Sequence, residues 1–329
     1  MDVLTSTAPA DPQLKLRTPY EPPLGEEAIE EVAKVLGASV APMIFVEGGA
    51  QGASTLVRQL AEVLQAPVVA YRTGMGVVDA RSYLSLHLPA AKDLWRKPML
   101  FWPSVPTRIP AKKWIRTHRP DIIRIDVDPT THRRFFTPKC ETTARAEQAL
   151  PLLLRTLEKY NAVRSPRETA LMEVKAAWEA RSAVLEPQLS DLKVIREEIG
   201  EHGIFVDELT QVGFAIRIVY PVYSPRTYIS TGYQGTLGYG FPTALGVKVA
   251  KPNVPVVSIT GDGGFMFAVQ EIATAVQHKI PLIVLLLNNN CLGNVRQMQA
   301  NDYGGRIIAT DLRNPDFCRL SESFGAQAF

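Results

Sequence analysis

The sequence has few cysteines, little net charge and no long apolar run. Its three cysteines, Cys140, Cys291 and Cys318, are too few and too widely spaced for a disulfide framework or a zinc pattern. The net charge of +3 comes from scattered basic residues and does not indicate nucleic-acid binding. No apolar stretch approaches the roughly 20 residues that span a bilayer, and no signal peptide begins the chain. These absences predict a cytoplasmic protein that binds neither nucleic acid nor membrane.

Two kinds of catalytic pattern are also missing. No Gly-x-Ser-x-Gly elbow occurs, which argues against a serine hydrolase of that type. The five histidines are dispersed and show no metal-binding spacing. His278 is expected to end a helix, where a cation suits the helix dipole, whereas His118 and His132 are expected at the surface.

What the chain does contain is two stretches in which strand-like and helix-like segments alternate. This alternation predicts an α/β fold made of two doubly wound domains, each with a parallel sheet flanked by helices. Long helices are expected at 142–160 and 265–278. The predicted division is a linker at 1–23, a central α/β domain at 24–160, a connector at 161–188 and a second α/β domain at 189–329. Both ends look cut, so we expect the second domain to be C-terminally incomplete.

Polar residues follow two predicted strands of the second domain. The run VPVVSIT ends in Gly261-Asp262-Gly263-Gly264, and the run PLIVLLL ends in three asparagines, 288–290. If the two runs and the helix between them form one βαβ unit, both strands end at the same edge of the sheet, where open α/β sheets bind ligands. A carboxylate and an amide oxygen would then meet at one point.

Those oxygens suggest the kind of ligand. Asp262 and Asn289 offer hard oxygen donors, which suit Mg²⁺ or Ca²⁺ rather than zinc. Mg²⁺ usually completes its shell with water and phosphate oxygens, and glycines beside a helix start allow an anion to approach the backbone closely. The pattern therefore predicts a metal-bridged diphosphate site.

Gly-Asp-Gly followed 24 residues later by Asn-Asn resembles the signature of thiamine-diphosphate-dependent enzymes. The upstream GTLGYGFPTALG resembles the matching stretch of the acetolactate synthase and benzoylformate decarboxylase group. The resemblance covers about 24–329 and implies the central domain and most of the diphosphate-binding domain. It implies thiamine diphosphate and Mg²⁺ as cofactors and decarboxylation or carboligation of 2-keto acids as the activity.

The resemblance also assigns roles to individual positions. It implies that Asp262, Asn289 and the backbone carbonyl of Cys291 bind the metal, and that Asn290 adopts a left-handed conformation. It implies that Leu237 wedges between the two cofactor rings and that the Gly235 carbonyl accepts from the cofactor's amino group. The remaining positions expected to bind the cofactor are Gly261, Gly263, Gly264, Leu292 and Gly293.

One role of the family has no counterpart in this sequence. A glutamate that bonds the far ring nitrogen belongs to a separate pyrimidine-binding domain, which is expected to be absent here and to come from another subunit of a homo-oligomer or a partner chain. Glu271 is interpreted as structural, and the roles of Glu47 and Glu208 are left open. The isolated chain is then expected to be inactive, and the alternative is a non-catalytic cofactor-binding fragment or subunit.

Three further hypotheses remain open. FVEGGAQGA, which begins at Phe45, could cradle a dinucleotide phosphate, as in a nucleotide-binding oxidoreductase, although it lacks the G-x-G-x-x-G spacing. PSVPTRIP (103–110) lies where some relatives of the family bind a flavin. Thr210 or Gln211 could touch a diphosphate at the start of the second domain.

Overall fold

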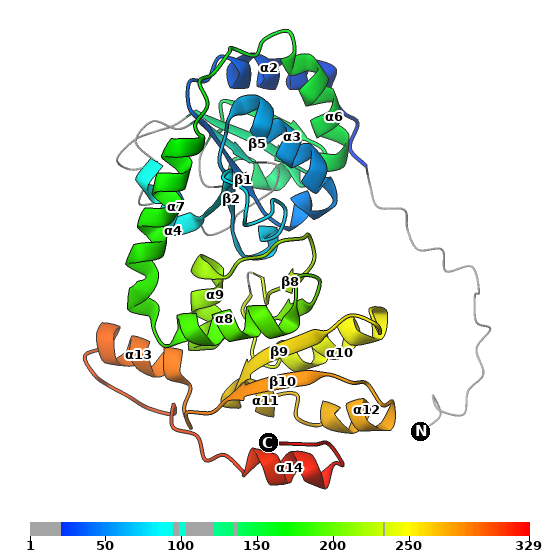
Figure 1. Ribbon diagram of the computed structural model, residues 1–329, viewed down its shortest axis with the longest axis vertical. Coiled ribbons are helices and arrows are strands. Elements are labelled where there is room, and N and C mark those ends of the chain that lie inside the picture. The colour runs from blue at the N-terminus through cyan, green and yellow to red at the C-terminus, as the bar shows by residue number, and fades with distance from the viewer. Residues whose placement is uncertain (1–20, 95–98, 103–120, 135–136, 233) are drawn as a thin grey trace, which may run out of the picture.

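The structure is a computed structural model that describes residues 21–94, 99–102, 121–134, 137–232 and 234–329. Two parallel sheets stack along the long axis of the molecule (Figure 1). This arrangement confirms the predicted α/β class with parallel sheets flanked by helices.

The first sheet has six strands in the order β3-β2-β1-β4-β5-β6, and every pairing in it is parallel. This is the strand order of a doubly wound sheet. The strands are β1 (Pro42–Val46), β2 (Val68–Ala70), β3 (Ser85–His87), β4 (Met99–Trp102), β5 (Ile122–Asp126) and β6 (Cys140–Thr143).

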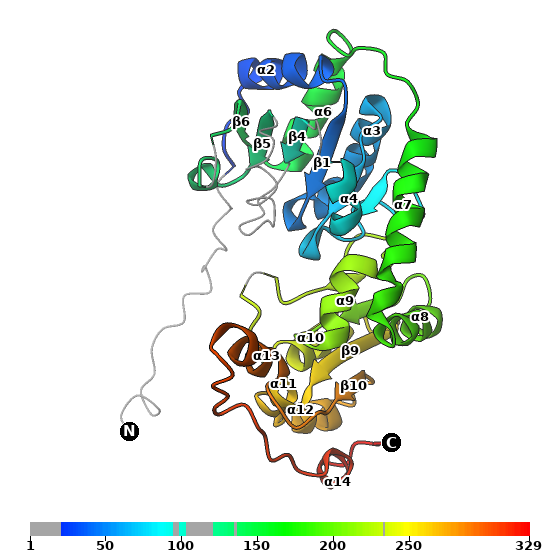
Figure 2. The same ribbon diagram turned by 90° about the vertical axis from the view of Figure 1, so that its left-hand side faces the viewer.

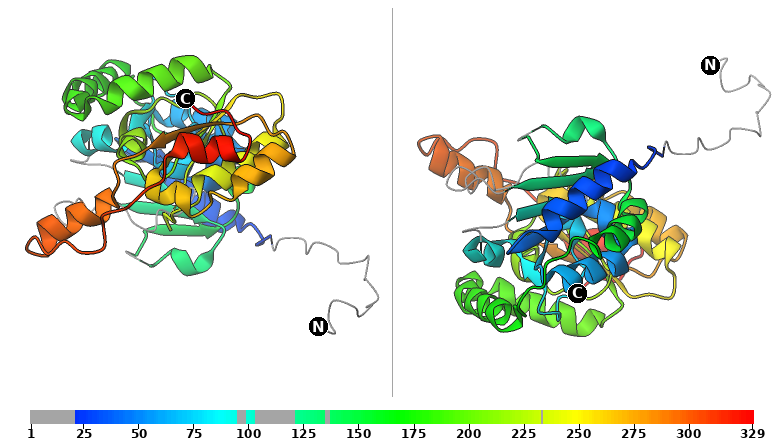
Figure 3. Two further views of the ribbon diagram at one scale, coloured as in Figure 1. Left: turned by 90° about the horizontal axis from the view of Figure 1, so that it is seen from below. Right: turned by 90° about the horizontal axis from the view of Figure 1, so that it is seen from above.

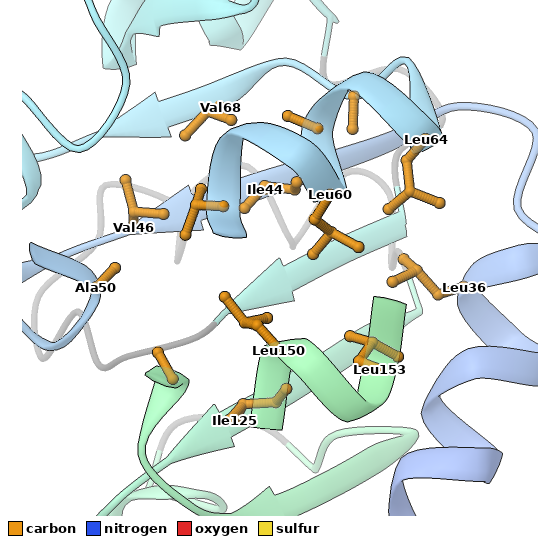
Figure 4. Close-up of a cluster of buried hydrophobic side chains, with 14 of the residues drawn as sticks. Leu36, Ile44, Val46, Ala50, Leu60, Leu64, Val68, Ile125, Leu150 and Leu153 are labelled. Carbon is orange, nitrogen blue, oxygen red and sulfur yellow. The ribbon is translucent and has the colours of Figure 1, made fainter. Parts of the chain in front are cut away.

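Helices α2 (Glu26–Gly37), α3 (Ser54–Leu64) and α6 (Ala146–Leu157) cover one face of this sheet. In α2 the buried residues recur at the helical period as Ile29, Val32, Ala33 and Leu36, with glutamates in the first turn. Figure 4 shows side chains of these helices, among them Leu36, Leu60 and Leu150, packed with strand residues such as Ile44 and Ile125. The short helix α4 (Leu88–Leu94) packs on the other face.

The helix predicted at 142–160 begins later than expected. Thr142 and Thr143 extend β6 and pair with Ile125 and Asp126, so the first residues of that segment are strand. β-branched residues suit a strand position beside a buried neighbour, and here the pairing overrides the helical interpretation.

The second sheet has four parallel strands in the order β10-β9-β7-β8. They are β7 (Ile204–Val206), β8 (Tyr228–Ile229), β9 (Val256–Gly261) and β10 (Ile283–Leu287). The helices around it are α8 (Gln188–Ile199), α9 (Gln211–Val219), α10 (Gly240–Ala250), α11 (Asp262–Met266), α12 (Glu271–Gln277), α13 (Gly293–Asp302) and α14 (Phe317–Ser323). Seen from below, α14 lies across the end of the molecule beside α12 (Figure 3).

The predicted helix at 265–278 is two helices. α11 stops at Met266 and α12 starts at Glu271, with a turn between them. In that turn Phe267 lies so close to Gly238 that a Cβ on the glycine would come within 2.7 Å of the Cβ of Phe267. His278 caps the C-terminus of α12, as expected.

The segment at 161–188 contains the helix α7 (Glu168–Ser182), which runs alongside both sheet layers (Figure 2). Lys175 Nζ donates to the carbonyls of Ala80 and Ser82 in the first layer, each at 2.8 Å. Trp178 Nε1 donates to the carbonyl of Ile218 on α9 at 2.9 Å. α7 therefore braces the two layers against each other. No helix among the described residues is long and apolar enough to cross a membrane.

Candidate cofactor site

The two polar motifs lie side by side at one edge of the second sheet. β9 and β10 pair in parallel, and Gly261 is the register partner of Leu287. Asp262 and Asn288 are therefore the next residues beyond two paired strand ends. The predicted βαβ unit is confirmed, and it brings the acidic residue and the asparagines to the same edge.

A single amide nitrogen marks the point where these side chains meet. Asn314 Nδ2 lies 2.6 Å from Asp262 Oδ2, 2.9 Å from Asn288 Oδ1 and 3.2 Å from Asn290 Oδ1. Three side-chain oxygens from the two strand ends thus surround one donor. Asn314 comes from the segment before α14, and nothing in the local sequence predicts its position.

The turn at 288–293 has its own internal bonds. Asn290 has φ 55°, the left-handed conformation predicted for it. Asn289 Oδ1 accepts from the Cys291 N–H at 3.2 Å, so the side chain of Asn289 faces its own turn. The N–H of Leu292 donates to the Thr310 carbonyl at 2.8 Å, and a β-bridge joins Cys291 to Asp311. The structure therefore places Asn288 and Asn290 beside Asp262, while the side-chain oxygen of Asn289 is engaged locally.

Side chains pack closely against two glycines after β9. A Cβ on Gly263 would lie 2.8 Å from Leu292 Cδ2, and a Cβ on Gly264 would collide with the carboxylate of Glu208. Gly261, by contrast, has no contact closer than 3.7 Å to such an atom. The first turn of α11 leaves backbone N–H groups without intrahelical partners at this edge.

Glu208, whose role the sequence left open, joins the loops of the site. Its side chain is 1% exposed, and Oε1 accepts from the Gly238 N–H at 2.7 Å. Oε2 accepts from the Gly240 N–H at 3.0 Å and from the Thr260 hydroxyl at 2.8 Å. One buried carboxylate therefore ties the end of β9 to the loop that carries Leu237.

The loop with Gly235 and Leu237 is the second predicted part of the site. Gly235 and Gly238 have φ of 59° and 78°, in the left-handed region that favours glycine. Leu237 between them is 36% exposed, so part of its side chain is free to contact a ligand. The hydrogen bonds from the Gly238 and Gly240 N–H groups to the Glu208 carboxylate hold its loop in place.

Other residues singled out in the sequence have structural positions. Thr210 caps α9 through its hydroxyl, which accepts from the Gly213 N–H at 2.8 Å, and Glu271 accepts from Thr274 at 2.8 Å. The predicted surface position of His132 is wrong. Its side chain is 3% exposed and bonds Thr143 at 3.1 Å, because the 3-10 turn at 129–131 folds back over β6.

The segment considered for a nucleotide is used internally. GGAQGA forms a 3-10 helix, Gly48–Ala53, in which the Gly48 N–H donates to Thr73 Oγ1 at 3.0 Å. Gln51 Nε2 donates to the carbonyls of Thr73 and Met75. The segments considered for a flavin (103–110) and around His118 lie outside the described residues.

Asp207, next to Glu208, is a buried carboxyl group whose ionisation makes folding depend on pH. It is fully buried 3.7 Å from Arg217, and burial raises the pKa of its carboxyl group to about 6. Because this pKa is lower in the unfolded chain, folding takes up a proton between about pH 4 and pH 6. The stability that the group contributes is complete below this window and is lost as the pH rises through 6.

We expect Asp207→Asn to remove that dependence. The unfolding free energy of the variant, relative to that of the wild type, should rise by about 2 kcal/mol between pH 4 and pH 7. Urea unfolding of both proteins at a series of pH values measures it. Parallel pH curves for the two proteins would contradict the assignment.

The donor set at the sheet edge fits a hard divalent cation bound with a diphosphate. Among the described residues no group of three or more His, Cys, Asp or Glu could hold a metal ion alone. Amide and backbone oxygens must therefore complete any cation site beside Asp262, and such oxygens suit Mg²⁺. Asp262 is 3% exposed, so a partner is needed for its charge when it is ionised.

Comparison with known proteins decides the family. Residues 209–329 match the family described as "Thiamine pyrophosphate enzyme, C-terminal TPP binding domain". The large subunit of acetolactate synthase isozyme 3 from Escherichia coli is 30% identical over 323 residues, which cover 90% of this chain and 55% of that protein. The chain belongs to the acetolactate synthase-like group of thiamine-diphosphate-dependent enzymes.

Two further relatives are similar to this chain over the same extent. The acetolactate synthase large subunit of Haemophilus influenzae is 31% identical over 318 residues, 90% of this chain and 55% of that protein. A probable 2-ketoarginine decarboxylase, AruI, of Pseudomonas aeruginosa is 30% identical over 310 residues, 91% of this chain and 55% of that protein. The chain spans about half the length of the curated relatives it matches.

Proposed function

We propose that the chain is part of an Mg²⁺-dependent thiamine-diphosphate enzyme that decarboxylates or carboligates 2-keto acids. The observation that carries the proposal is the meeting of Asp262 with the asparagine turn at the shared edge of β9 and β10. The relatives named acetolactate synthase and 2-ketoarginine decarboxylase support a 2-keto acid as the substrate class.

In this proposal Mg²⁺ is held by Asp262, by Asn289 and by the backbone carbonyl of Cys291. Turning the Asn289 amide away from Cys291 would free its oxygen for the cation. Gly261, Gly263, Gly264, Leu292 and Gly293 would form the walls around the diphosphate. The carboxylate balances the cation's charge, and the first-turn N–H groups of α11 favour an anion beside it.

Leu237 and the Gly235 carbonyl would fix the shape of the bound cofactor. Thiamine diphosphate, once bound, supplies the nucleophilic carbon and the electron sink for cleavage beside a carbonyl group. Leu237, partly exposed on a loop pinned by Glu208, would press between the two rings and keep water from them. The Gly235 carbonyl would accept a hydrogen bond from the cofactor's amino group and so orient that group.

The proposed complete enzyme needs residues that this sequence does not supply. We propose domains at 24–160 and 189–329, a linker at 1–23 and a connector at 161–188, with the pyrimidine-binding glutamate outside this sequence, in another subunit of a homodimer or tetramer or in a partner chain. Exposed apolar side chains beside the site, Met266 at 41% and Phe267 at 67%, support a covering segment. The assembly would work in the cytoplasm.

Turnover assays test this proposal. The chain alone is expected to show no pyruvate consumption above the protein-free rate, and mixing it with a chain that carries a pyrimidine-binding domain should restore turnover that depends on Mg²⁺ and thiamine diphosphate. Calorimetric titration of the chain with thiamine diphosphate, once in the presence of Mg²⁺ and once in the presence of a chelator, measures cofactor binding apart from turnover. Pyruvate turnover by the lone chain would contradict the assigned incompleteness, and absence of metal-dependent cofactor binding would contradict the function.

A further inference from the structure

A cavity lies between α7, α8, the C-terminal end of α9 and the segment that includes β3. It has a volume of about 500 Å³. Figure 2 shows α7 descending beside these elements to α8. Its volume is within the range of small-molecule sites. None of its lining residues belongs to the proposed cofactor site.

The wall of this cavity holds a buried guanidinium group without a polar partner. Arg196 on α8 is 8% exposed and lies between two rings, 5.5 Å from the centroid of Tyr220 and 5.2 Å from that of Tyr223. Its Nε and Nη2 are buried and have no hydrogen-bond partner among the described residues, and neither has the Tyr220 hydroxyl. Leaving such donors without an acceptor is costly, so an acceptor in the cavity that these groups reach by a small movement of the side chain would bind favourably.

Other cations at the cavity are already engaged or exposed. Lys175 donates to two backbone carbonyls, and Lys193 lies at the exposed side of α8. Glu179 and Glu197 line the cavity from exposed positions. Burial lowers the pKa of His87, also in the wall, to about 4, so it is neutral near pH 7. Among these charges the cations exceed the carboxylates by one.

Apolar and aromatic surface forms much of the remaining wall. The indole of Trp178 is fixed by its hydrogen bond to the Ile218 carbonyl. Leu192, Val219 and Pro221 also line the cavity. A net charge of one positive unit beside such a wall matches a ligand that carries one negative charge and a flat or compact apolar body. The Nε and Nη2 of a guanidinium point the same way and suit the two oxygens of a carboxylate.

We propose that this cavity is a binding site for a small monocarboxylate with an apolar body, in which Arg196 binds the carboxylate and Trp178, Tyr220 and Tyr223 contact the body. The site lies at the C-terminal end of α9, whereas Thr210 caps the opposite end of that helix near the sheet edge. The proposal does not depend on the proposed function.

The test titrates the full chain with benzoate, cyclohexanecarboxylate and hexanoate. Binding is followed by calorimetry and by tryptophan fluorescence, since Trp178 lines the cavity. At least one acid is expected to bind saturably, and benzamide, the neutral counterpart of benzoate, at least about 10-fold more weakly. Arg196→Met should raise the dissociation constant about 10- to 100-fold, because a hydrogen bond to a charged group is lost.

Matched variants separate the outcomes. Lys251→Met removes an exposed charge at the end of α10, outside the cavity wall, and should change the dissociation constant less than about 3-fold. Trp178→Phe should remove the fluorescence response while calorimetry still detects binding, and circular dichroism of Arg196→Met should match the wild type. Binding by none of the three acids, equal binding of Arg196→Met, or tighter binding of phenylphosphonate than of benzoate would overturn the proposal.

Discussion

Replacing Asp262 with alanine is expected to weaken Mg²⁺-dependent binding of thiamine diphosphate at least about 100-fold. Asp262 is the one carboxylate in the proposed ligand set, and the other ligands are neutral oxygens, so its loss removes the only negative charge that the protein offers the cation. Even residues that merely orient metal ligands are worth about 10- to 100-fold. Calorimetric titration of the variant with cofactor and Mg²⁺ measures the loss.

The fold should survive this substitution. Within the part of the chain that the structure describes, the Asp262 side chain accepts a hydrogen bond from Asn314, and removing it costs about 1 kcal/mol. Asp302→Ala, at the exposed end of α13, is the matched control and should bind the cofactor as the wild type does. Equal affinity of Asp262→Ala and the wild type would refute the metal assignment.

Glu208→Ala is expected to lower the free energy of unfolding by about 3–5 kcal/mol. It leaves the N–H groups of Gly238 and Gly240 and the Thr260 hydroxyl without their acceptor, and each unmade buried bond costs about 1–3 kcal/mol. Glu208→Gln should cost less, because the amide keeps one acceptor oxygen but turns its nitrogen toward a donor. Urea unfolding measures both losses, and Glu198→Ala, exposed on α8, should stay within about 0.5 kcal/mol of the wild type.

The same variant should also weaken cofactor binding at least about 10-fold, since the loop of Leu237 loses its anchor. A core variant separates this effect from general destabilisation. Ile199→Ala removes a side chain that is 4% exposed before β7, at the opposite edge of the sheet. It should be destabilised by about 2–5 kcal/mol yet keep its cofactor affinity at temperatures where it is folded. If both variants lose affinity equally, Glu208 has no special role in positioning the loop.

The parts of this structure that the sequence predicted depend on local patterns. The apolar stripe of α2 and the short aliphatic runs of β9 and β10 predicted their elements, because burial imposes its period on the residues themselves. The approach of Asp262 to the asparagine turn followed from the parallel arrangement alone, although the side chains beside it are Asn288 and Asn290 and not the expected Asn289. The left-handed Asn290 followed from the family resemblance, which places it where the family often has glycine.

What the sequence did not reveal depends on contacts between distant residues. Glu208 and Thr260 are separated by 52 positions, and no local pattern shows that they share a hydrogen bond. Asn314 is equally far from Asp262 and approaches it through an irregular segment. The early part of 142–160 became strand because it pairs with β5, and His132 became buried because a turn folds over β6.

Anomalous diffraction from crystals of the chain grown with thiamine diphosphate and Mn²⁺ in place of Mg²⁺ tests the central claim most directly. We predict one manganese peak about 2.1 Å from a carboxylate oxygen of Asp262, bridged to the cofactor's diphosphate and bordered by the turn at 288–291. A bound cofactor whose manganese lies away from Asp262, or whose diphosphate occupies another part of the molecule, would contradict it.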